Sequence, residues 1–112
     1  MRERYRQQVR LLRRVQEKTG GGKPEVYRPI ATVSCEVRDE KYDAQNADQG
    51  APIVEQKIVS MRARLILADD AVEWQGNLYE IVYVDGYNNR GREIRLRVRR
   101  RKAHWSVLGE NA

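Results

Sequence analysis

Few side chains of this sequence are of the types that perform catalysis or bind a metal. His104 is the only histidine and Cys35 the only cysteine, and they lie far apart along the chain. A catalytic nucleophile needs an adjacent base, and a structural metal site needs several thiolate or imidazole ligands. We therefore expect no catalytic residue, no metal site and no cofactor, and a protein that is not an enzyme.

Two further patterns associated with ligand chemistry are incomplete. The carboxylates of residues 39–52 do not recur at the alternate positions of a calcium loop, which also closes with a glutamate. Three consecutive glycines at positions 20 to 22 lack the spacing of a phosphate-binding loop, and they predict a flexible turn instead. No stretch reaches the roughly 18–20 consecutive apolar residues of a membrane helix, so we expect no membrane partner.

The chemistry that the sequence does offer is that of arginine. The chain has 112 residues and a net charge of +6 at pH 7. Residues 1–14 carry a charge of +5 and residues 90–102 a charge of +7, so the rest of the chain carries −6. Arginine donates paired hydrogen bonds to carboxylate and phosphate groups. Two basic ends and an acidic middle suit nucleic-acid binding, docking on an acidic protein, or stacking of copies head to tail.

The most regular arginines lie in residues 92–99, where three aliphatic residues alternate with three arginines. This period of two predicts a strand with an apolar inner face and a basic outer face. The inner residues are Ile94, Leu96 and Val98. From the two basic blocks we predict a set of docking arginines that contact other subunits or partners: Arg6, Arg10, Arg95, Arg97, Arg99, Arg100 and Arg101.

Strand signals dominate the remainder of the chain and predict an all-β fold. About six antiparallel strands with short turns indicate a small β-barrel or sandwich. Cys35 falls on the apolar face of the second strand, where we expect a buried core residue. The predicted strands are residues 5–15 (with a helix as the alternative), 31–37, 59–67 as the longest, 72–74, 78–85 and 92–99, and a turn is predicted over 86–91.

One long connection separates the second and third predicted strands. Residues 39–52 are polar, poor in β-branched residues and end in Gly-Ala-Pro, which predicts a long mobile loop. We expect residues 1–102 to form a single domain, followed by a tail over 103–112 that is too short to pack as an element by itself.

Aromatic side chains leave open an alternative function. A small nucleic-acid-binding β-barrel of the OB or SH3-like type, rich in Arg and Tyr, would stack bases on exposed rings. The candidate rings are Trp74, Tyr79, Tyr83 and Tyr87. Tyr79 and Tyr83 share a strand face with Ile81, and this arrangement favours packing in the core over base stacking.

The order of motifs over residues 4–102 resembles the head-tail joining proteins of long-tailed bacteriophages, also called head closure or adaptor proteins. The most telling segment is 70–81, with an aromatic-x-Gly turn at Trp74 to Gly76, followed by the basic strand. The other segments that carry the resemblance are RQQVRL at 6–11, TVSCEV at 32–37 and MRAR at 61–64.

The resemblance implies a structural protein of the virion neck, assembled in the host cytoplasm. Such a protein forms a small antiparallel β-barrel in a sixfold or twelvefold ring that contacts portal or adaptor and tail proteins. It joins the DNA-filled head to the tail and helps to seal the packaged DNA, with non-specific DNA contact. The resemblance also implies that the loop projects towards the DNA channel as a gate, built from Asp39, Glu40, Lys41, Tyr42, Asp43, Gln45, Asn46, Asp48 and Gln49.

Overall fold

The computed structural model describes residues 5–15, 25–39, 55–88 and 91–109. These residues form seven strands and no α-helix. The strands are β1 (Gln7–Arg14), β2 (Glu25–Asp39), β3 (Gln56–Arg62), β4 (Asp70–Trp74), β5 (Asn77–Asn88), β6 (Glu93–Arg100) and β7 (Trp105–Val107).

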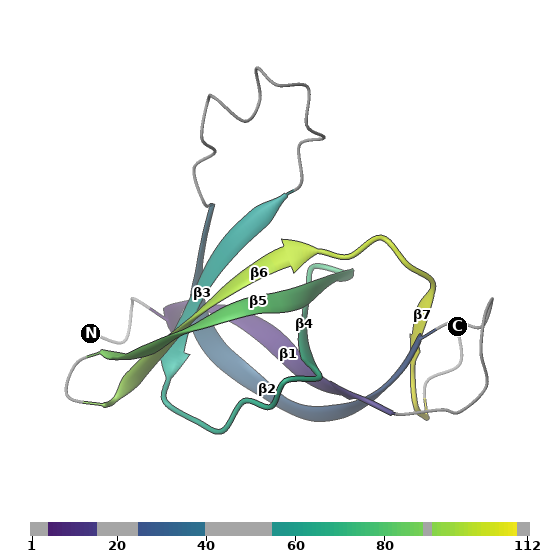
Figure 1. Ribbon diagram of the computed structural model, residues 1–112, viewed down its shortest axis with the longest axis horizontal. Coiled ribbons are helices and arrows are strands. Elements are labelled where there is room, and N and C mark those ends of the chain that lie inside the picture. The colour runs from purple at the N-terminus through teal and green to yellow at the C-terminus, as the bar shows by residue number, and fades with distance from the viewer. Residues whose placement is uncertain (1–4, 16–24, 40–54, 89–90, 110–112) are drawn as a thin grey trace, which may run out of the picture.

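Six of the strands close into an antiparallel barrel (Figure 1). They follow the order β1-β4-β5-β6-β3-β2, and β2 pairs again with β1. Closure satisfies the backbone groups that an open sheet would expose at its two edges. The all-β prediction is therefore confirmed, and its barrel form is the one adopted.

The barrel interior is filled by the apolar positions of the alternating strands. Cys35 is fully buried, as predicted, and so are the three aliphatic residues of β6. The main core cluster consists of Val9, Leu11, Cys35, Val59, Met61, Val72, Tyr79, Ile94, Leu96 and Val98. Each strand of the closed barrel contributes to this cluster, so core packing and barrel closure depend on the same residues.

A second, smaller cluster holds β7 against the barrel. β7 runs parallel to the start of β2, with Val107 opposite Tyr27. The cluster combines Leu12, Tyr27, Ala71, Leu78 and Val107, and Trp105 packs against it. Successive residues of a strand point to opposite faces, so Leu11 faces the main core while Leu12 faces this cluster. The short segment after Lys102 thus forms an element only by pairing with β2.

Several strand boundaries differ from the sequence prediction, and β2 already begins at Glu25. The third strand is not the longest: β3 ends at Arg62, and β2 is the longest with 15 residues. Leu65 and Leu67, which the sequence prediction includes in the third strand, are 71% and 41% exposed. The chain turns here because the Asp70 carboxylate accepts a hydrogen bond from the Leu67 N–H at 2.8 Å. The predicted turn over 86–91 is also too long, because β5 continues through Asn88.

Candidate functional site

β6 presents the regular arginines on the outside of the barrel, as the alternation predicts. Arg97 and Arg99 are exposed, and Arg95 is half-buried. β6 lies between β5 and β3, so Arg97 has Tyr83 as its register partner on one side and Ile58 on the other. Together with Arg6, which is also exposed, Arg97 and Arg99 are the exposed members of the predicted docking set.

Several of the docking arginines, Arg99 among them, form ion pairs within the molecule. Arg99 donates to Glu80, and Arg10 Nη2 lies 2.5 Å from Glu73 Oε1. Arg100 Nη1 lies 3.5 Å from Glu55 Oε1. Much of the acidic middle of the sequence therefore neutralises the basic ends within one barrel.

Glu25 is the centre of one of these networks. Its Oε1 accepts hydrogen bonds from Arg101 Nε at 2.8 Å and from the Tyr27 hydroxyl at 2.9 Å. Arg14 Nη2 lies 3.7 Å from Oε2. Hydrogen bonding from Arg101 lowers the pKa of Glu25, and burial beside this carboxylate raises the pKa of Tyr27 to about 12. Glu25 is thus held as a carboxylate at neutral pH.

A second network joins the two strand ends that flank residues 40–54. Lys57 Nζ lies 2.5 Å from Asp39 Oδ1 and 3.5 Å from Glu55 Oε2. The Tyr79 hydroxyl donates to Glu55 Oε2 at 2.6 Å, which lowers the pKa of Glu55. The Lys57 ammonium also lies 5.1 Å from the centre of the Trp74 ring. These contacts hold the two flanking strand ends together.

Only one of the predicted gate residues belongs to the described part of the chain. Asp39 ends β2 with its side chain 82% exposed. The remaining gate residues lie outside the described residues: Glu40, Lys41, Tyr42, Asp43, Gln45, Asn46, Asp48 and Gln49.

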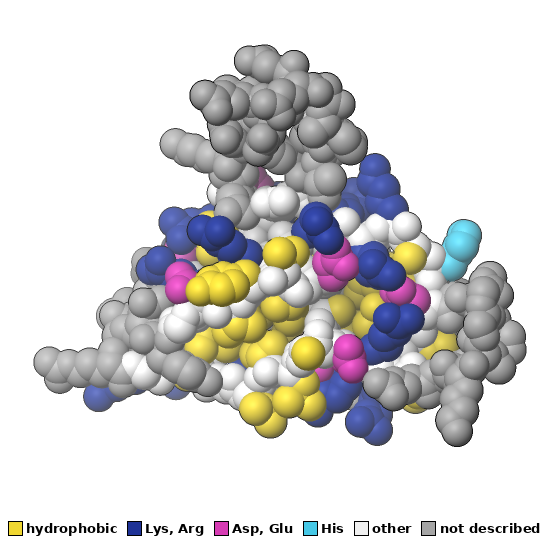
Figure 2. All heavy atoms as spheres, in the orientation of Figure 1, with side chains coloured by type: hydrophobic (Ala, Val, Ile, Leu, Met, Phe, Trp, Pro, Cys, Tyr) yellow, Lys and Arg dark blue, Asp and Glu magenta, His cyan; other side chains and the backbone are white. Residues whose placement is uncertain are grey.

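The predicted stacking rings do not form one exposed platform. Tyr79 is 1% exposed, as expected for core packing, and Trp74 is half-buried. The core prediction for Tyr83 was wrong, because a register shift after Ile81 turns Tyr83 outwards, where it is 56% exposed. The side chain of Tyr87 lies outside the described part. Figure 2 shows hydrophobic side chains over β5 and towards the β3–β4 connection, with charged residues around them.

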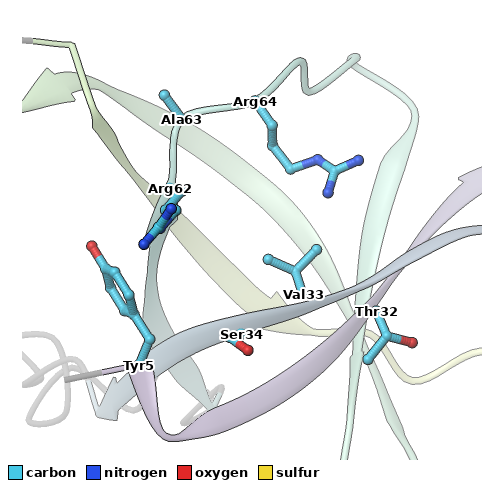
Figure 3. Close-up of a pocket in the computed structure, with 7 residues that line it drawn as sticks. All are labelled: Tyr5, Thr32, Val33, Ser34, Arg62, Ala63 and Arg64. Atoms are coloured by element: carbon cyan, nitrogen blue, oxygen red, sulfur yellow. The ribbon is translucent and has the colours of Figure 1, made fainter. Parts of the chain in front are cut away.

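A cleft of about 560 Å³ opens beside β2, and sequence reasoning missed it (Figure 3). Its lining residues are Tyr5, Thr32, Val33, Ser34, Arg62, Ala63 and Arg64. Arg62 and Arg64 fell within a predicted continuous strand, so no sequence signal marked the separation of the two walls.

Comparison with known proteins decides the family. Residues 1–101 match the family described as phage head completion protein. This chain belongs to that family. The head completion protein has no match among curated proteins. Its fold is shared with a solution structure, protein SF1141 from Shigella flexneri 2a, at 15% identity over 87% of this chain and 93% of that chain, with a TM-score of 0.58.

Family membership fixes the broad role of this head completion protein. It is a structural component of the phage particle that interacts with other head and tail proteins, and its family is structural rather than catalytic. In the described ranges no group of three His, Cys, Asp or Glu side chains is placed to hold a metal ion. Over the same ranges, no helix is long and apolar enough to cross a membrane.

Proposed function

We propose that this head completion protein sits in the virion neck, joins the DNA-filled head to the tail, and helps to retain the packaged DNA. The observation that carries the proposal is the extent of the family match. It spans residues 1–101 and so includes all six strands of the closed barrel. We therefore assign the proposed joining function to the whole barrel. We take residues 1–102 as the joining domain and 103–112 as its tail.

The protein acts in this proposal as one subunit of a sixfold or twelvefold ring, between portal or adaptor proteins and tail proteins. A ring requires two different faces of each subunit to meet. The exposed arginines of β6 offer a basic face, and the exposed Asp69, directly before β4, supplies a carboxylate elsewhere on the barrel. Arg6, Arg97 and Arg99 are the exposed docking arginines, and Arg10 and Arg101 pair with Glu73 and Glu25 within the barrel.

The basic face is tested by charge reversal at Arg97, with complementation of a phage that lacks this gene. We expect Arg97→Glu to fold normally and to reduce tailed particles strongly, because like charges repel across an interface. Arg28→Glu, an exposed reversal on β2, is the matched control and should complement. Full infectivity of the Arg97→Glu phage would remove the basic face from the proposal.

The gate is a separate part of the proposal. The network of Lys57 with Asp39 and Glu55 supports it, because both ends of the intervening segment are fixed to one place on the barrel. Deleting residues 44–50 should leave the barrel folded and the particles joined, while DNA escapes from them. DNA content is measured by nuclease protection in purified particles. Unchanged DNA retention would refute the gate and leave the joining role intact.

The nucleic-acid-binding alternative is not favoured. Base stacking needs exposed rings in a row, yet Tyr79 is buried and its hydroxyl is bound to Glu55. Non-specific contact with packaged DNA remains part of the proposed neck function, through the exposed arginines.

A further inference from the structure

The cleft beside β2 lies where the pairing between β2 and β3 ends. The ladder between β2 and β3 ends at the pair Cys35 and Met61. Continuing this antiparallel register would pair Ser34 with Arg62, Val33 with Ala63 and Thr32 with Arg64. Instead, these six residues stand on the two walls of the cleft (Figure 3). The cleft therefore lies between positions whose register the β2–β3 ladder already sets.

Both walls are supported from behind, while the edges that face the cleft are open. Residues 32–34 pair with Gln8 to Arg10 of β1 on one side. On their other side, the described ranges place no strand. The opposite wall is tied to β6, because Ala63 N–H donates to the Arg92 carbonyl at 2.9 Å. Open strand edges carry backbone donors and acceptors that pair readily with an added strand.

The side chains of the cleft indicate the charge of that strand. Arg62 and Arg64 have no acidic partner among the described residues, in contrast to Arg10, Arg13 and Arg101. Arg64 Nε is buried and has no hydrogen-bond acceptor within the described part. A buried guanidinium nitrogen without an acceptor is unfavourable, and a carboxylate is its strongest partner.

We propose that this cleft binds an extended acidic peptide segment of another virion protein, which inserts as a strand between residues 32–34 and 62–64. Its backbone would pair with the two open edges, and its carboxylates would bind Arg62 and Arg64. Val33 and Ala63 add apolar contacts. A peptide fits better than DNA, because a nucleic acid has no backbone amide to complete the strand ladder. The inference rests on family membership and does not require the neck position.

The test is an NMR titration of the full chain with short overlapping peptides. The peptides cover the other head and tail proteins encoded with this gene. We expect an acidic peptide to shift and protect amides of residues 32–34, Arg62 and Arg64, whereas the Ala63 amide is already bound to Arg92. Arg62→Glu with Arg64→Glu should weaken its binding about tenfold or more. Arg28→Glu with Lys102→Glu makes the same charge change at exposed positions outside the cleft and should leave binding unchanged.

A second measurement separates strand pairing from simple charge attraction. Methylating backbone nitrogens of the bound peptide removes donors and blocks strand addition without altering the side chains. We expect the methylated peptide not to bind the unmodified protein. Because this measurement uses the unmodified protein, it remains valid if the double variant fails to fold. Equal binding of the methylated peptide would overturn the proposal. The proposal would also be overturned if only a DNA duplex, or only a peptide of this chain, protected the cleft. Protection by none of the peptides would overturn it as well.

Discussion

Arg101 and Glu25 form a salt bridge between residues 76 positions apart in the sequence. Arg101 Nε lies 2.8 Å from Glu25 Oε1 and 3.0 Å from Oε2. The bridge joins the end of β6 to the first residue of β2. It lies beside the point where β7 begins, because Glu25 N–H donates to the His104 carbonyl at 2.8 Å. The basic C-terminal block thus stabilises its own barrel before it meets any partner.

Replacing one member of this bridge should destabilise the protein measurably. Glu25→Gln keeps the size of the side chain but removes the carboxylate bound by Arg101 Nε and leaves Arg101 with Glu80 alone. We therefore expect a loss of about 1–3 kcal/mol in the free energy of unfolding. Urea unfolding of Glu25→Gln, Arg101→Gln and the double variant measures the coupling. Additive losses from the two single variants would show that Arg101 and Glu25 do not stabilise each other.

The carboxylates of Glu25 and Glu55 should determine how the stability of the protein changes in acid. Glu25 and Glu55 have lowered pKa values in the folded protein, through hydrogen bonds from Arg101 and Tyr79 respectively. Their contribution is complete above the ordinary pKa of 4.5 and is lost as the pH falls through the lowered values. As the pH falls from neutral to acidic, the free energy of unfolding should therefore decrease less in the double variant Glu25→Gln with Glu55→Gln than in the unmodified protein. An unchanged pH slope would contradict these assignments.

Cys35 should react with thiol reagents only when the barrel opens. The side chain is fully buried, and burial raises the pKa of its thiol to about 11. Labelling at pH 8 should be slow in native protein and fast in denaturant, as followed by absorbance of a released chromophore. Rapid labelling of the native protein would show that β2 separates from β3 at this position.

Two leucines of similar sequence context should differ widely in their effect on stability. Leu96 is fully buried in the main core, so Leu96→Ala should cost about 2–5 kcal/mol. Leu65 is 71% exposed, so Leu65→Ala should change the stability by no more than about 0.5 kcal/mol. Thermal unfolding of both variants checks the difference. A large loss of stability for Leu65→Ala would contradict its exposure and support the longer third strand that the sequence predicts.

Local alternation predicted the parts of the fold that depend on one strand at a time. The inward residues of β6 and the burial of Cys35 follow directly from a period of two. Leu65 could not be placed in this way, because its alternation continues beyond the residue at which β3 leaves the sheet. Tyr83 was misplaced because a register shift between neighbouring strands leaves no mark on the sequence of either one.

The candidate site was less accessible to sequence reasoning, because it depends on contacts between distant segments. The spacing of the arginines predicted a basic face, but it could not reveal that Arg99, Arg100 and Arg101 face Glu80, Glu55 and Glu25. The cleft at Arg62 and Arg64 arises where two strands separate, and such a gap has no composition of its own. Barrel closure brings both features about.

The most direct test of the joining function is electron microscopy of particles made by a phage that lacks this gene, with packaged DNA quantified in parallel. We predict heads that package DNA but lose it and lack tails, together with free tails. Supplying the intact gene from a plasmid should restore tailed, DNA-filled particles. Normal tailed particles in the absence of the gene would contradict the proposed joining and sealing role.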